Sequence, residues 1–151
     1  PRLHRWKFNL KTGVTSEEDI CDETIEFGVI NQEIAGIEHR YTYSMIPTKG
    51  HFTFDGITKH DHKKNSISKY AFPEHIFISE VSFAQSTASN SNNEDDGYLI
   101  TISNDVKEKT SSCLMFDAKN IEIGPICEIP LPHQVCSGTH ATWAQISNLK
   151  T

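Results

Sequence analysis

The chain has 151 residues, of which 36% are hydrophobic, and a formal net charge of −6 at pH 7. This length allows one domain with a core of its own. The acidic balance argues against nucleic-acid binding, because no basic stripe is present to neutralise phosphates. No run of apolar residues approaches the roughly 18 that a membrane-spanning helix needs.

Polar and apolar residues alternate with a period of two along most of the chain, which is the pattern of half-buried β-strands. It is clearest at residues 4–10 (HRWKFNL), 39–45 (HRYTYSM) and 98–103 (YLITIS), and polar turn residues separate such runs. Only residues 15–20 (TSEEDI) indicate a helix, as a short acidic turn that a Thr or Ser would cap. The sequence therefore predicts an all-β protein.

Three segments share one shape: an alternating strand, an Asn or Asp, a polar turn and a second strand. The Asn or Asp positions are Asn9, Asp61 and Asp117, which are 52 and 56 positions apart. Such a side chain can bond to the backbone of the following residues and so begin a turn. Hairpin repeats of roughly 50 residues are typical of β-propeller blades. Three repeats are too few to close a ring, so we expect the chain to be a fragment of a longer protein.

An acidic run, Glu94, Asp95 and Asp96, has the residue types of a cation site. Its acids are consecutive, whereas the ligands of an EF-hand loop alternate along the chain. We interpret the run as an acidic hairpin turn closed by Gly97.

The cysteines contain no Cys-x-x-Cys pair and no regular framework of spacings; they are Cys21, Cys113, Cys127 and Cys136. Neither a zinc site nor a disulfide scaffold is indicated. We predict buried, reduced thiols in an intracellular protein.

Four of the eight histidines lie in patterned segments near the middle and start of the chain. His4 and His39 each precede an arginine in an alternating run, so solvent-facing strand positions explain them. His60 and His62 would share a strand face, but they lie at a lysine-rich turn, where positive charge disfavours a metal. We therefore do not expect a metal site there.

His140 stands in SGTHATW, between Gly138 and Trp143. The residues alone leave three roles open for it: a packed or turn residue, a catalytic base, or one ligand of a metal. A single histidine cannot hold a metal, and general-base catalysis would need a partner. On composition alone, a packed or turn role is favoured.

Several segments in order resemble the C-terminal part of the carotenoid cleavage oxygenases, a family that includes apocarotenoid and lignostilbene dioxygenases. The matching stretches are RLHRWKFNLKTG, IEFGVIN, AGIEHRYTYSM, ISEVSFAQS, EDDGYLITI, SSCLMFDAKNIEIGPICEIPLP and SGTHATWA. They cover nearly the whole chain and are most similar to the bacterial branch. The resemblance implies that residues 1–151 are the C-terminal blades of a seven-bladed β-propeller, whose N-terminal blades are absent here.

The resemblance also implies a non-haem Fe(II) ion held by four histidines on the propeller axis. His140 matches the last of these ligands, and the other three would precede Pro1. Glu26 and Glu80 match family glutamates that accept a hydrogen bond from a ligand histidine; Glu74 is a competing choice for the second. An isolated chain of this length could not assemble the iron site.

The implied reaction is cleavage of a conjugated C=C bond by O2 into two carbonyl products. We expect the substrate to be a carotenoid or apocarotenoid. A lignostilbene-type phenylpropanoid with the same chemistry, or a non-catalytic propeller that binds lipophilic ligands, is the alternative. We expect a cytoplasmic protein that can contact a membrane peripherally, although Ile76, Phe77 and Phe83 are better explained as strand core.

Overall fold

The structure is a computed structural model that describes residues 1–87 and 93–144. These residues form eleven strands and two short 3-10 helices. The elements are β1 (His4–Phe8), β2 (Thr15–Asp19), β3 (Glu26–Val29), η1 (Gln32–Ile34), β4 (Tyr41–Pro47), β5 (Phe54–Asp61), β6 (Ser66–Ala71), β7 (Ile76–Ile78), β8 (Ser82–Gln85), β9 (Gly97–Asp105), β10 (Thr110–Asp117), η2 (Ile121–Ile123) and β11 (Pro125–Pro130). The predicted all-β class is confirmed.

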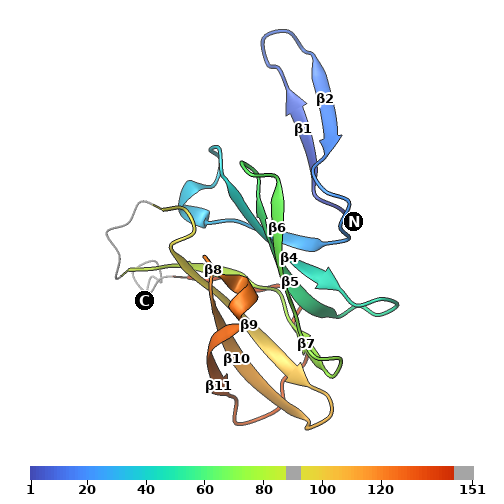
Figure 1. Cartoon of the computed structure of the whole chain (residues 1–151), viewed down its shortest axis with the longest axis vertical. Coiled ribbons are helices and arrows are strands. Elements are labelled where there is room, and N and C mark those ends of the chain that lie inside the picture. The colour runs from blue at the N-terminus through green and yellow to red at the C-terminus, as the bar shows by residue number, and fades with distance from the viewer. Residues whose placement is uncertain (88–92, 145–151) are drawn as a thin grey trace.

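Two antiparallel meanders make up most of the fold (Figure 1). In the first, β3, β4, β5 and β6 pair in chain order, and in the second, β8, β9, β10 and β11 do so. The short strand β7 joins them, since it pairs with β5 at Phe54 and with β9 at residues 103–105. Each meander has the four-stranded form of one propeller blade.

The β1–β2 hairpin stands apart from both meanders at the N-terminal end (Figure 1). The helix predicted for residues 15–20 is wrong, because Thr15–Asp19 is strand β2 and pairs antiparallel with β1. Cross-strand charge pairs stabilise this register: Glu18 contacts both Arg5 (3.2 Å) and Lys7 (3.0 Å). The attraction between opposite charges across the two strands favours a strand here more than the Thr or Ser cap favours a helix.

The repeat read from the sequence corresponds to three turns of the same kind. Asn9 Oδ1 accepts hydrogen bonds from the N–H groups two and three residues ahead, and Asp61 Oδ1 does the same. Asp117 Oδ1 accepts from Lys119 N at 2.9 Å. These turns follow β1, β5 and β10, so each precedes the last strand of its hairpin or meander. Asp105 makes an equivalent turn after β9 that the repeat did not include.

The core lies where the two meanders face each other. Its fully buried side chains include Tyr43 and Met45 from β4 and Leu99 from β9. The Tyr43 ring stacks on Phe83 at 5.8 Å, and its hydroxyl donates to the carbonyl of Ala118. Burial raises the pKa of Tyr43 far above its usual range. Phe83 is therefore core, as the sequence indicated.

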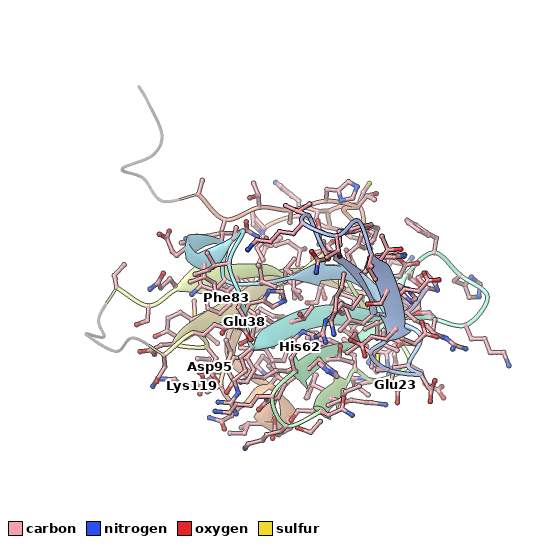
Figure 2. The ribbon with its side chains drawn as sticks, turned by 90° about the horizontal axis from the view of Figure 1, so that it is seen from above. Glu23, Glu38, His62, Phe83, Asp95 and Lys119 are labelled. Carbon is pink, nitrogen blue, oxygen red and sulfur yellow. The ribbon has the colours of Figure 1, made fainter. Side chains whose placement is uncertain are left out.

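The acidic turn before β9 ties the meanders together. Glu94 accepts hydrogen bonds from the backbone N–H groups of Arg40 and Tyr41 at 2.7–2.9 Å. Asp95 accepts from the ammonium group of Lys59 at 2.7 Å, and the Lys59 side chain is only 8% exposed. Figure 2 shows Asp95 beside Lys119, whose carbonyl accepts a second hydrogen bond from Lys59. The run is a turn, as interpreted, but its charges are structural.

We predict that Asp95→Asn lowers the free energy of unfolding by about 3 kcal/mol, because it leaves the buried Lys59 ammonium without its counter-charge. Urea unfolding followed by circular dichroism measures this change. Glu18→Gln is the control, since its partners lie on an exposed hairpin and its loss should change stability little. Equal midpoints for Asp95→Asn and the unaltered chain would contradict the role assigned to the pair.

Candidate functional site

The segment that carries His140 is held against the connection between β7 and β8. Gly138 N donates to Ser79 Oγ at 2.9 Å, and Ala141 N donates to Glu80 Oε2 at 2.6 Å. Two neighbouring residues of the β7–β8 connection thus anchor the chain on either side of His140. The segment does not depend on a strand of its own for its position.

The His140 ring is oriented by Glu80 and by an aromatic side chain. Its Nδ1 faces Glu80 Oε2 at 3.4 Å, and the edge of Phe27 packs on the ring with centroids 5.2 Å apart. The Glu80 side chain is 12% exposed, whereas that of His140 is 73% exposed. A proton on Nδ1 would point at the carboxylate, which leaves Nε2 with its lone pair on the open side. This arrangement suits a histidine that binds a metal through Nε2.

Glu26 is next to Phe27, whose ring contacts His140, but no described contact joins Glu26 itself to the histidine. It lies on β3 directly before Phe27, which has a φ of 48°. Among the contacts described for residues 1–87 and 93–144, none joins the Glu26 carboxylate to His140. The structure therefore brings Glu80 and His140 together and leaves Glu26 as a neighbour. Glu74, the competing choice, is exposed in the turn before β7.

The surroundings of Gly138 do not require a glycine. A Cβ built there would meet Ser79 Oγ at 3.5 Å, which is ordinary van der Waals contact. Its contribution is the N–H group that bonds to Ser79. At Gly28 the surroundings are tighter, since a Cβ would meet Thr42 Cγ2 at 3.3 Å.

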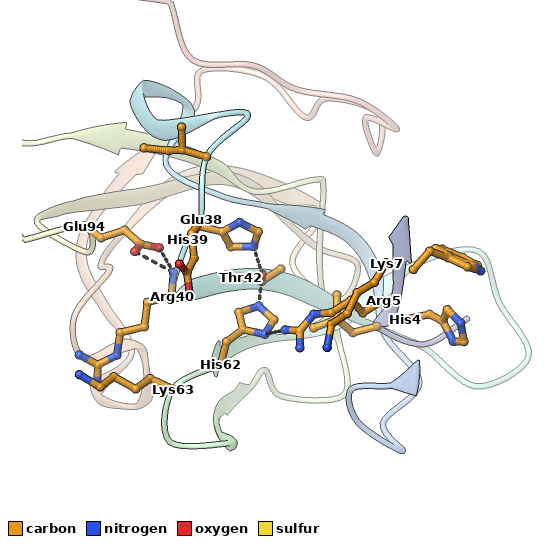
Figure 3. A pocket seen from close by; sticks show the side chains of 13 residues that line it. His4, Arg5, Lys7, Glu38, His39, Arg40, Thr42, His62, Lys63 and Glu94 are labelled. Atoms are coloured by element: carbon orange, nitrogen blue, oxygen red, sulfur yellow. Dashed lines mark hydrogen bonds between the residues drawn. The ribbon is translucent and has the colours of Figure 1, made fainter. Parts of the chain in front are cut away.

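Three of the remaining histidines, His39, His60 and His62, form a cluster that the sequence did not predict; Figure 3 shows His39 and His62. The rings of His60 and His62 are 4.6 Å apart, and those of His62 and His39 are 5.3 Å apart. His60 is only 3% exposed, on β5, so its predicted place at a lysine-rich turn is wrong. His39 is half-buried before β4 and is not a solvent-facing strand residue. His4 is on β1 as expected, but its ring contacts Asp19 at 2.7 Å.

Within residues 1–87 and 93–144, no group of three or more His, Cys, Asp or Glu side chains could hold a metal ion. His140 would thus need ligands from elsewhere. The four cysteines are free thiols; Cys127 and Cys136 are exposed and Cys21 and Cys113 are half-buried, so the prediction of buried thiols is wrong. The described helices include none of the length and apolarity needed to cross a membrane.

Comparison with known sequences gives a consistent result. The profile of one family, described as retinal pigment epithelial membrane protein, matches residues 1–145. Carotenoid 9,10(9',10')-cleavage dioxygenase 1 of Pisum sativum is 30% identical, over 92% of this chain and 28% of its own length. The carotenoid cleavage oxygenase of Mycobacterium tuberculosis is 29% identical, over 95% of this chain and 29% of its own. The chain therefore spans less than a third of the length of these relatives.

Solved structures show the same fold. Cobalt-substituted Synechocystis apocarotenoid oxygenase superposes with a TM-score of 0.86 at 23% identity, covering 95% of this chain and 30% of that one. A chimera of apocarotenoid oxygenase and RPE65 gives 0.84 at 24% identity, with the same coverage. These likenesses confirm the predicted architecture, a part of a β-propeller.

We predict that Glu80→Ala speeds hydrogen exchange at the Ala141 amide about tenfold, because the amide loses its acceptor. Exchange followed by NMR reports this at a single residue. Glu80→Gln keeps a carbonyl acceptor, so its exchange rate at Ala141 should lie between those of the unaltered chain and Glu80→Ala. Glu74→Ala changes an exposed turn and should leave the rate unchanged. Undiminished protection in Glu80→Ala would show that Glu80 does not hold this segment.

Proposed function

Because this chain belongs to the retinal pigment epithelial membrane protein family, whose matched relatives are carotenoid cleavage dioxygenases and oxygenases, we propose that it is part of a non-haem Fe(II) dioxygenase. In this proposal residues 1–151 are the C-terminal blades of its propeller. The single observation that carries the proposal is the pairing of an exposed His140 with a nearly buried Glu80. A bound iron would supply the activation of O2 for cleavage of a conjugated C=C bond.

His140 is the proposed iron ligand of this chain. A neutral imidazole binds Fe(II) through one nitrogen, and imidazole nitrogen is a suitable ligand for iron. Glu80, facing Nδ1, would hold the proton on that atom and so keep Nε2 available. The carboxylate would also raise the basicity of the ligand nitrogen and fix the angle of the ring. The T-shaped contact with the Phe27 ring limits the rotation of the imidazole.

Glu26 is proposed to support a different ligand histidine. It does not reach His140 in the described contacts, yet it lies beside Phe27, which does. A carboxylate at this position would face a second histidine on the axis from another part of the protein. Its role would be the same as that of Glu80, to fix a tautomer and a ring orientation.

The proposed substrate is a carotenoid or an apocarotenoid, cleaved with O2 to two carbonyl products. The names of the matched relatives support this class. The aromatic and aliphatic side chains of the β-sheet core can exclude water from the polyene chain of such a substrate. The test is to incubate a full-length protein that contains this chain with carotenoids, apocarotenoids and a stilbene, and to follow the loss of absorbance of the conjugated system. The substrate that is consumed separates this proposal from the stilbene alternative. We place the protein in the cytoplasm, with peripheral access to membranes.

We predict that a full-length protein containing this chain binds on the order of one iron per chain. His140→Ala should abolish most of this binding. Metal analysis after anaerobic Fe(II) loading measures it. His133→Ala is the matched control, since His133 is exposed in the same C-terminal segment. Glu80→Gln should weaken iron binding by about 10- to 100-fold, as loss of a supporting carboxylate does in other metal sites.

Two results would overturn this assignment. Unchanged iron content in His140→Ala would mean that another residue is the ligand. An iron-free protein after anaerobic loading would instead support a non-catalytic propeller that binds lipophilic ligands.

A further inference from the structure

Strand β3 contains a β-bulge at the residue whose ring contacts His140. Its pairing with β4 shifts by one position, so that Phe27 and Gly28 together lie opposite the single residue Ser44. A bulge adds one residue to a strand without a partner and bends the strand locally. Such bulges occur frequently next to active sites, where they change the direction of a side chain. In β3 the side chain that changes direction is that of Phe27.

The backbone of Phe27 is strained. Its φ of 48° lies in the left-handed region, which residues with a bulky side chain rarely adopt. Gly28, the next residue, could adopt this conformation at no steric cost, but its own φ is not positive. The aromatic residue therefore carries the strain, although a glycine lies beside it. Strained backbone of this kind occurs chiefly at functional sites, where the surrounding structure maintains it.

The strained conformation turns the Phe27 ring towards the core and His140. In a regular strand successive side chains point to opposite faces, so the ring would lie on the face opposite to Glu26, whose partner Met45 is buried. The Phe27 ring instead makes T-shaped contacts with Phe54 and His140, with centroids 5.6 and 5.2 Å away. Phe54 is only 3% exposed, so one side of the Phe27 ring rests on the fixed core. The other side contacts the imidazole.

The connection between β7 and β8 is a second bulge. Both strands pair with β9, but their registers differ by one position, so that residues 79–81 lie opposite only two residues of β9. The register of β7, if continued, would place Glu80 opposite the buried Thr101. The register of β8 gives this place to Val81, which is fully buried. Glu80 is thereby kept out of the core and faces His140 Nδ1 at 3.4 Å.

Hydrogen bonds hold the second bulge in place. Thr101 Oγ1, on β9, donates to the carbonyl of Ser79 at 2.9 Å, and Ser79 N donates to the carbonyl of Ile102 at 2.9 Å. Ser79 Oγ in turn accepts from Gly138 N. The carboxylate side of the imidazole is therefore fixed by hydrogen bonds, whereas the Phe27 side is fixed by ring packing.

The two contacts restrict different motions of the imidazole. A carboxylate that faces Nδ1 fixes one atom, but it leaves the ring free to rotate about the line from Nδ1 to the carboxylate oxygen. The Phe27 ring lies at 76° to the imidazole plane, which is the T-shaped arrangement that aromatic pairs favour. Rotation of the imidazole about that line would lose this contact. Glu80 thus controls which nitrogen carries the proton, and Phe27 controls the plane of the ring.

We propose that Phe27 is a positioning residue for the His140 imidazole, with its ring turned to that imidazole by the strained bulge in β3. The inference rests on the proposed role of His140 as an iron ligand. An imidazole whose plane is already fixed presents the Nε2 lone pair in one direction and loses little freedom when a metal binds. The bulge in β3 and the bulge between β7 and β8 therefore prepare one ligand atom together.

We predict that Phe27→Leu, in a full-length protein that contains this chain, weakens Fe(II) binding about tenfold, as loss of a supporting residue does in other metal sites. Anaerobic competition with a chelator measures this affinity. In the metal-free protein labelled with ¹³C,¹⁵N-histidine, ring relaxation should show a more mobile His140 imidazole. The ring nitrogen shifts should still place the proton on Nδ1, because Glu80 is unaltered. Phe27→Tyr keeps an aromatic ring and should restore both the affinity and the ring order.

Two controls separate positioning from general support of the fold. Phe52→Leu is the same substitution at an exposed aromatic residue that also contacts the Phe54 ring, at 6.0 Å, and it should change neither measurement. Hydrogen exchange at the Ala141 amide should be the same in Phe27→Leu and the unaltered protein, because Glu80 still accepts from that amide. Faster exchange there would make Phe27 a support of the whole segment and overturn the proposal.

Two further results would overturn it: a His140 ring as ordered in Phe27→Leu as in the unaltered protein, or a mobile ring with unchanged iron affinity. The proposed iron site fails separately. If the unaltered protein binds no iron but the metal-free Phe27→Leu ring becomes mobile, Phe27 still positions the imidazole, and only the role of His140 as an iron ligand is lost.

Discussion

A buried ammonium group sets the relation between the two meanders. Lys59 projects from β5 of the first meander, and its charge is met by Asp95 and by the carbonyl of Lys119, both from the second. The Tyr41 ring covers the same ammonium at 4.2 Å. Because an unpaired charge in this position would cost several kcal/mol, the meanders can pack only in the arrangement that pairs it. The apolar core supplies most of the stabilisation, and this pair selects one geometry for it.

The candidate site depends on that geometry. Glu80 lies in the connection that leads into β8, and the strands that carry it are positioned by the packing of the two meanders. From there Ser79 and Glu80 bind the backbone on both sides of His140. Phe27, from β3 of the first meander, packs on the same ring. The histidine is thus held by the β7–β8 connection and by the first meander, although it belongs to neither.

His140 and His62 use the imidazole ring in opposite ways. At His140 a carboxylate faces the ring and leaves one nitrogen open to the outside. At His62 a guanidinium faces the ring, and both nitrogens are used within the protein. The first arrangement prepares a ligand atom, and the second makes a contact that depends on the charge of the ring. The residue type is the same, and the charge of its neighbour decides the role.

The sequence by itself determined the all-β class and the hairpin repeat. Both arise from local causes: side chains alternate with a period of two along a strand, and residues such as Asn9 and Asp61 bond to the backbone a few positions ahead. It also marked His140 and Glu80 through a family resemblance, but spacing alone could not join them. Local chemistry favoured a helix at residues 15–20, where the cross-strand partners of Glu18 produce a strand instead.

Only the tertiary structure decided which distant residues meet. Glu80 and Ala141 are 61 positions apart, Arg5 and His62 are 57 apart, and Lys59 and Asp95 are 36 apart. No local pattern encodes such pairs, because they result from the packing of segments that lie far apart in the chain. The burial of Lys59, a residue type that usually faces water, follows from the packing of the two meanders. Strand periodicity tells which residues share a face, and packing alone tells what that face meets.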